Sequence, residues 1–289
     1  MMSRAALGLM WLCHFLPLPL LAPIGQGLGM LLYLLARERR SVCLINLERC
    51  FPQLGERERR RVARAHFRAQ GRALLERGLL WWGSRERLLR LVRVVGMEHL
   101  QQWRGRPLIV FAPHFVALDA GATRMTAEGD FAGLYSRQKS PLMERMLQKG
   151  RTRFGHQTVI SRQEGVRPLL AALRRGVPVY YLPDQDYGAR DAIFVPFFGV
   201  PAATITALSR IARVARARVL PCVMKMLPGG QGYEVRFHPV WDNFPTDDIE
   251  ADTRRMNAFI EERVREMPEQ YNWMHKRFKT RPPGEGKWY

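Results

Sequence analysis

The sequence predicts an α/β fold in which a mixed, partly parallel β-sheet is flanked by helices and preceded by an apolar helical anchor. After residue 90, short apolar runs alternate with segments of helical periodicity, which is the pattern of strand–helix–strand units. No internal repeat or low-complexity linker divides the chain. With 289 residues, 47% of them hydrophobic, it can bury one full core. We therefore expect a membrane anchor over residues 1–40 and one domain over residues 41–289.

The expected anchor carries no charged residue between positions 5 and 36. About 20 apolar residues suffice to span a bilayer, so this stretch is long enough. Three prolines between positions 17 and 23 interrupt it, and they predict two short helices, roughly over residues 5–16 and 24–36. A single bent span and a pair of helices lying in one leaflet are both consistent with this pattern.

A signal peptide is the competing interpretation of the same stretch. Its length would fit, but no small-x-small cleavage site follows it. The stretch ends instead in the basic segment Arg37-Glu-Arg-Arg40. By the positive-inside rule, this segment and the chain after it stay on the cytoplasmic side. The run Gly25-x-Gly27-x-Gly29 lacks the spacing and the preceding strand of a dinucleotide fingerprint.

Residues 56–82 have the spacing of a long helix whose N-terminal half is crowded with arginines. Those arginines form either a solvated face or a contact with anionic lipid. The later elements follow from apolar runs, helical spacing and turn residues. We expect strands at 91–95, 107–112, 131–135, 158–161 and 177–182, helices at 116–127, 141–154, 166–175, 203–215 and 247–267, and a hairpin of strands 218–227 and 232–240.

The formal net charge of +20 predicts attraction to a polyanion: nucleic acid, anionic lipid headgroups or an acidic protein. The four cysteines include no CxxC pair, and no histidine cluster has metal-ligand spacing. A disulfide framework and a zinc site are therefore not expected, and a reducing compartment fits best. Asp184 and Asp186 resemble a Mg²⁺ pair, but the Tyr-Gly that follows reads equally as a turn, so we predict no metal.

His114 ends a buried apolar run that stops at Pro113, and Asp119 follows five positions later. Residues five apart on one helix point about 140° apart, so the two would meet only if His114 lies in the strand-to-helix turn. Asp119 would then accept a hydrogen bond from one ring nitrogen and leave the other as a general base. Such a pair can activate a hydroxyl for acyl transfer. The plainer alternative is a strand-end histidine bonded to a nearby helix cap.

Polar residues follow two further strands, and ligands of open α/β sheets bind beyond the carboxyl ends of strands. Arg137 follows the strand at 131–135, and Asp184 and Gln185 follow the strand at 177–182. Arg151 and Arg153 lie at the end of the next helix. All five are candidates for substrate binding, with ordinary surface solubility as the alternative for each arginine.

Five segments carry a resemblance to a known family. They are residues 46–52, the His-x4-Asp motif at 114–119, the blocks at 181–188 and 194–199, and the string at 268–282. His-x4-Asp alone is unspecific, whereas the last string is long and specific. On these segments nearly the whole chain resembles the lipid A biosynthesis late acyltransferases, the lauroyl and myristoyl transferases of Gram-negative bacteria, within the lysophospholipid acyltransferase superfamily.

The resemblance implies a glycerolipid acyltransferase-like fold and a monotopic or single-pass enzyme on the cytoplasmic face of the inner membrane. It implies transfer of a fatty acyl group from acyl carrier protein to a hydroxyl of a lipid A precursor, an anionic glycolipid. His114 would be the base and Asp119 its orienter. Asp184 and one of Arg151 and Arg153, with a slight preference for Arg153, would be the other functional residues. No cofactor beyond the carrier-bound acyl donor and no nucleic-acid partner are expected.

Two alternatives stand beside this interpretation. An acyltransferase acting on a phospholipid or an amino-acid lipid would use the same histidine and carboxylate, and only the segments at 181–199 and 268–282 separate it from the favoured family. A membrane-tethered basic binding protein is the alternative from another class. It would leave the histidine, arginine and aspartates at the strand ends without a role.

Overall fold

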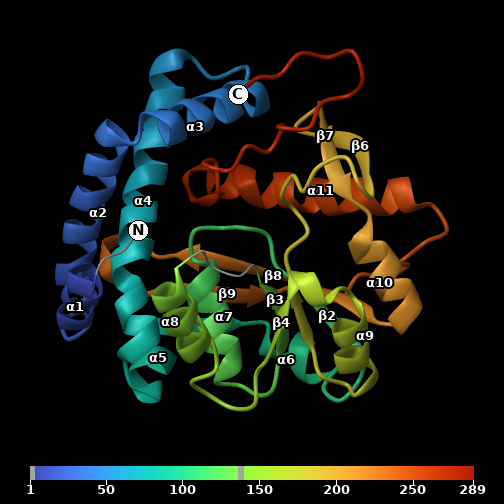
Figure 1. Cartoon of the computed structure of the whole chain (residues 1–289), viewed down its shortest axis with the longest axis horizontal. Helices are drawn as coiled ribbons and strands as arrows, with labels where there is room; N and C mark the ends of the chain where they lie inside the picture. Colours follow the sequence, from blue (N-terminus) through green and yellow to red (C-terminus); the bar gives the residue numbers. More distant parts are fainter. Residues whose placement is uncertain (1–3, 136–139) are drawn as a thin grey trace.

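The computed structural model describes residues 4–135 and 140–289. Within these residues a seven-stranded sheet has the order β1-β9-β8-β2-β5-β3-β4, and β6 and β7 form a separate pair (Figure 1). Only the β8–β9 pair of the large sheet is antiparallel, so the sheet is mixed and mostly parallel, as expected. The strands are β1 Val92–Val95, β2 Leu108–Phe111, β3 Ala132–Tyr135, β4 Thr158–Ser161, β5 Val179–Tyr181, β6 Ala192–Phe197, β7 Val200–Ile205, β8 Arg218–Met226 and β9 Tyr233–Phe237.

Helices cover both faces of this sheet, and Figure 1 shows α11 on one side and α7 and α8 on the other. Successive strand residues alternate between two apolar clusters. Ile109 and Phe111 pack with α9, α10 and α11, whereas Leu108 and Val110 pack with α7 and the second half of α4. The α-helices are α1 Arg4–Cys13, α2 Leu18–Leu35, α3 Arg37–Cys50, α4 Glu56–Trp82, α5 Arg85–Leu91, α6 Met97–Gln101, α7 Leu118–Thr126, α8 Pro141–Arg151, α9 Arg167–Arg174, α10 Ala207–Ala215 and α11 Ile249–Glu266.

The N-terminal helices differ from the expected pair. The second helix, α2, begins at Leu18 and continues through Pro23 to Leu35. Its contact with α4 explains this, because packing along a neighbouring helix outweighs one lost backbone hydrogen bond. Figure 1 shows the two helices side by side. Gly25 and Gly29 meet Gly71 at the contact, where an added Cβ would collide with the opposite backbone.

The outer faces of α1 and α2 expose large apolar side chains to solvent. Among the described residues, α2 is the one helix long and apolar enough to cross a membrane, with a mean hydropathy of 1.6 and a third of its residues buried. A contiguous apolar surface of this kind is typical of a contact with another molecule or a membrane. Its members are Leu9, Trp11, Leu12, Phe15, Leu20, Ile24, Leu31, Leu34 and Leu35.

Two other elements depart from the sequence-based expectation. The helix expected at 203–215 begins only at Ala207, because residues 200–205 form strand β7 and pair with β6. This pairing partner overrides the helical propensity of Ala202 and Ala203. Helix α3 was not expected, although the buried side chains of Val42, Cys43, Asn46, Leu47 and Cys50 follow helical spacing.

Candidate active site

The centre of the site is a histidine–aspartate pair built by two neighbouring parallel strands. Phe111 of β2 is paired with Tyr181 of β5, and His114 and Asp184 each follow three residues later. The two side chains therefore leave the same edge of the sheet together. Nδ1 of His114 lies 2.6 Å from Oδ1 of Asp184, and the backbone N–H of His114 donates to Oδ2 at 2.9 Å. The expected convergence of strand ends thus brings His114 and Asp184 into direct contact.

Asp184 is fully buried and accepts a third hydrogen bond, from the hydroxyl of Tyr271 at 3.2 Å. Burial opposes ionisation of this carboxyl, but the His114 ring, its two hydrogen bonds and the Arg277 charge outweigh burial and lower its pKa. An ionised carboxylate only accepts hydrogen bonds, so Nδ1 of the neutral ring carries the hydrogen. Nε2 then keeps its lone pair, which is the state required of a general base.

Asp119 does not orient the imidazole as the sequence suggested, because Nδ1 is bonded to Asp184. Asp119 lies in the first turn of α7, and its Oδ2 pairs with the Arg77 guanidinium of α4 at 2.5 Å. Its side chain is 34% exposed. Burial raises its pKa, but the Arg77 and Arg151 charges outweigh burial and hold the pKa below the usual value. Helix α7 begins at Leu118, so the short connection after His114 leaves Asp119 facing α4.

The four other expected substrate-binding residues have different surroundings. Arg151 and Gln185 line the cavity that also contains His114. Arg153 instead donates to the carbonyls of Leu80 and Gly83 at the end of α4 and lies over the ring of Phe154. Of the two arginines, Arg151 is the one that lines the cavity, and a functional role for either remains a prediction. Arg137 lies outside the described residues.

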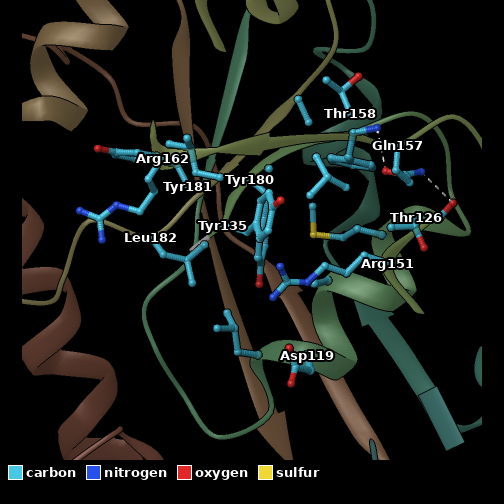
Figure 2. Close-up of a pocket in the computed structure, with 18 of the residues that line it drawn as sticks. Asp119, Thr126, Tyr135, Arg151, Gln157, Thr158, Arg162, Tyr180, Tyr181 and Leu182 are labelled. Carbon is cyan, nitrogen blue, oxygen red and sulfur yellow. Dashed lines mark hydrogen bonds between the residues drawn. The ribbon is translucent and has the colours of Figure 1, made fainter. Parts of the chain in front are cut away.

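A cavity of about 300 Å³ opens beside this pair, between α7 and the strands β3, β4 and β5. Figure 2 shows Asp119 and Arg151 toward one end of it and Gln157 and Thr158 toward the other, with Tyr135 and Tyr180 between them. Most of the intervening wall is apolar. It includes Leu118, Ala122, Met125, Phe131, Gly133, Leu134 and Val159.

The C-terminal segment at 268–282 packs against the loop that carries His114. The N–H of Asn272 donates to the carbonyl of His114 at 3.0 Å, and the N–H of Val116 donates to the carbonyl of Gln270 at 2.7 Å. The carboxylate of Asp186 accepts from the N–H and hydroxyl of Thr280. These bonds bring three segments of the family resemblance, 114–119, 181–188 and 268–282, together around His114 and Asp186.

Two residues of the site, Arg77 and Tyr271, were not identified from the sequence. Arg77 was hidden among many arginines of one helix, and nothing in its spacing distinguished it as the partner of Asp119. Tyr271 lies within the specific C-terminal string at 268–282, and its membership of that string is the signal that could have identified it. No group of three or more His, Cys, Asp and Glu side chains that could hold a metal ion occurs in residues 4–135 and 140–289.

Comparison with known proteins places this geometry in a family. Residues 2–280 match the family described as bacterial lipid A biosynthesis acyltransferase. The chain is 36% identical over 281 residues to the lipid A biosynthesis lauroyltransferase of Escherichia coli K12, covering 96% of this chain and 91% of that one. It is 34% identical over 286 residues to the palmitoleoyltransferase of the same organism, covering 98% and 92%.

The lipid A biosynthesis myristoyltransferase of Escherichia coli K12 is 33% identical over 270 residues, covering 92% of this chain and 82% of that one. The crystal structure of the 1-acyl-sn-glycerophosphate acyltransferase from Thermotoga maritima matches with a TM-score of 0.40 at 17% identity, covering 86% of this chain and 97% of that one. That structural likeness is too low to inform on substrate. The match to the family over nearly its whole length shows that the chain belongs to the bacterial lipid A biosynthesis acyltransferases.

Proposed function

We propose that this protein transfers a fatty acyl chain from acyl carrier protein to a hydroxyl of a lipid A precursor, with His114 as general base. One observation carries the proposal in a chain of this family: the ring of His114 is bonded to the buried Asp184, and His114 lines a largely apolar cavity. That arrangement combines a proton acceptor with a place for a hydrocarbon chain.

The reaction requires removal of a proton from an alcohol whose pKa is far above neutrality. In the proposed mechanism Nε2 of His114 accepts this proton while the alcohol oxygen bonds to the thioester carbon. Asp184 stabilises the imidazolium that forms. The carbon–sulfur bond then breaks, and the imidazolium returns the proton to the leaving thiolate. No acyl-enzyme and no cofactor are needed, because the thioester is already activated.

Charge that develops on the thioester oxygen needs a hydrogen-bond donor. We assign this role to Arg151, which lines the same cavity as His114 and whose charge acts on Asp119. Asp119 and Arg77 form the adjoining ion pair and are proposed to hold the polar mouth of the cavity in shape. Gln185, also on the cavity wall, is proposed to contact substrate.

Both proposed partners are anionic, in keeping with the net charge of +20. The acceptor carries phosphates and the carrier protein has an acidic surface, so arginine-rich faces favour both. Helix α4 exposes such a face. It consists of Arg57, Arg60, Arg61, Arg64 and Arg68. This proposal gives the positive charge a use that involves no nucleic acid.

We further propose that the protein lies on the cytoplasmic face of the inner membrane, with α1 and α2 in one leaflet. Helix α2 packs along α4 through Gly25, Gly29 and Gly71. If α2 crossed a bilayer, the arginines of α4 would therefore enter the hydrocarbon with it. Buried charges of that kind are costly in hydrocarbon. The exposed leucines of α2 can instead be submerged while the arginines of α4 meet the headgroups.

The test is a reconstituted assay with acyl carrier protein bearing a fatty acyl chain and an under-acylated lipid A precursor, read by product mass. The wild type should add one acyl group, and His114→Ala should lower the rate by about 10²–10⁴. Faster acylation of lysophosphatidate than of the lipid A precursor would favour the phospholipid alternative. An unimpaired His114→Ala variant would contradict the proposed chemistry.

A further inference from the structure

The relatives leave the choice of acyl chain open. The lauroyl-, palmitoleoyl- and myristoyltransferases are 36%, 34% and 33% identical to this chain, which is too even a spread to select among them. Chain length must then depend on a few local positions. The wall of the cavity beside His114 contains residues whose size sets the space for an acyl chain. The following inference rests on the function proposed above.

Strand β3 gives the cavity a depth scale. Side chains two residues apart on a strand share a face and are separated by roughly 7 Å. Tyr135 lies at the carboxyl end of β3, on the edge where His114 and Asp184 follow their own strands, and Gly133 and Phe131 lie one and two steps deeper. Gly133 therefore sits about halfway down the wall that these three positions form.

Gly133 has no side chain, so it leaves space in that wall. Its register partners on the neighbouring strands are Tyr180 and Val159, and both line the cavity, so a side chain at position 133 would enter the same space. A Cβ built there has Tyr180 as its nearest neighbour, at 4.0 Å. Its φ is not positive, so the backbone does not require glycine. Glycine weakens a strand interior and often marks the close approach of a ligand.

The amide of Gln157 lines the end of the cavity that lies away from Asp119 (Figure 2). Its Nε2 donates to the carbonyls of Phe154 at 2.9 Å and Gly129 at 3.1 Å, and its Oε1 accepts from the N–H of Phe131 at 3.2 Å. Figure 2 shows this amide beside Thr126, the last residue of α7. From Asp119 to Thr126 the helix rises roughly 10 Å, which sets the scale of the depth available.

Met125 supplies the flexible part of the wall before this end. It is 2% exposed and lines the cavity from α7, across from the strands that carry Gly133. An unbranched thioether fills irregular space and can be shortened without a change of charge. Gly133 and Met125 thus offer one position where atoms can be added to the cavity and one where they can be removed.

We propose that Gly133 and Met125 determine the longest saturated acyl chain that the enzyme transfers. The chain enters with its thioester at His114 and runs past Gly133 toward the Gln157 amide. A side chain at position 133 takes the place of deeper methylenes, whereas loss of the Met125 side chain makes room for more. A thioester whose tail does not fit cannot bring its carbonyl to His114.

The experiment is a competition among carrier-bound acyl donors of graded length, with the lipid A precursor as acceptor and product masses giving relative kcat/KM. Gly133→Val adds three heavy atoms and Met125→Ala removes three. At about 0.8 kcal/mol, or roughly fourfold, per buried methylene, Gly133→Val should lower kcat/KM for the longest accepted chain relative to shorter ones by up to about 60-fold. Gly133→Ala should give about fourfold. Met125→Ala should shift the preference toward longer chains.

Ile160→Ala is the matched control, because Ile160 is buried on β4 next to β3 but belongs to the cluster on the opposite face. It should lower thermal stability and leave the chain-length profile unchanged. A wild type that acylates no acceptor would refute the proposed function, and this inference with it. Wild-type transfer combined with the same profile in Gly133→Ala, Gly133→Val and Met125→Ala would overturn the chain-length inference alone. If Gly133→Val does not fold, the Gly133→Ala and Met125→Ala profiles decide.

Discussion

The substitution Asp184→Asn tests which carboxylate serves His114, the proposed general base. Asp184 accepts from the backbone N–H of His114, from its Nδ1 and from Tyr271. The backbone N–H can only donate, so it retains the amide oxygen of the new side chain. The amide nitrogen must then face Nδ1, which is forced to accept a hydrogen bond. The hydrogen of the ring moves to Nε2, and the base is lost.

The magnitude follows from this change of tautomer. In serine proteases the equivalent exchange lowers kcat by about 10⁴, and a general base contributes typically 10²–10⁴. We expect kcat to fall by about 10²–10⁴ in Asp184→Asn, with KM for donor and acceptor nearly unchanged, because the buried carboxylate touches neither substrate. Steady-state kinetics with carrier-bound donor and lipid acceptor measure both parameters.

Asp119→Asn is the matched control, since it breaks the Arg77 ion pair without changing the bond at Nδ1. Asp119→Asn should mainly raise KM, because Asp119 lines the cavity and its charge helps to position Arg77 and Arg151. The reasoning fails if Asp184→Asn stays within tenfold of wild-type kcat while Asp119→Asn loses a thousandfold. That result would mean that Asp119 orients the ring in the working enzyme.

Three further predictions concern stability. Burial lowers the pKa of His66 to about 4 from 6.5, so this residue binds more protons in the unfolded chain between these values. The contribution of His66 to the unfolding free energy should fall by roughly 3 kcal/mol from pH 7 to pH 4, and His66→Gln should remove that part of the pH dependence in urea titrations. Arg72→Met removes the charge partner of the buried Glu76 carboxylate and should lower the unfolding free energy by about 3–5 kcal/mol. The double variant Arg72→Met/Glu76→Leu should recover most of this loss. An Arg72→Met variant as stable as wild type would contradict the role of the ion pair. Gly71→Ala should cost about 1–3 kcal/mol by pushing α2 off α4. By contrast, Gly27→Ala, which has open space around it on the exposed face of α2, should not lower the melting temperature and should raise it slightly, because alanine favours a helix over glycine.

The sequence predicted the fold class and the location of the site because both depend on local patterns. An apolar run that ends at Pro113 marks a strand end, and neighbouring parallel strands present their ends at one edge, so His114 and Asp184 could be expected to converge. The partner of the imidazole could not be predicted in this way. It depends on strand order, which places β5 directly beside β2 while α7 turns Asp119 toward α4.

The dependence on tertiary contacts also explains the remaining differences between the sequence-based expectations and the structure. Arg151 and Arg153 are two residues apart near the end of α8, and only the position of α4 shows that Arg153 is engaged by helix-end carbonyls. The glycines at 25 and 29 were correctly separated from a nucleotide-binding motif, but their actual use required knowledge that Gly71 faces them. Contacts between segments distant in the chain carry no local sequence signal.

The bonds from residues 270 and 272 to the His114 loop have a consequence for biosynthesis of the protein. The histidine, its aspartate and the strands that carry them are all made well before the segment that secures them. On the ribosome the loop lacks these backbone partners until residues 270 and 272 have been made. The carboxylate of Asp186 gains its bonds from Thr280 later still, so the geometry around His114 can be completed only when nearly the whole chain has been synthesised.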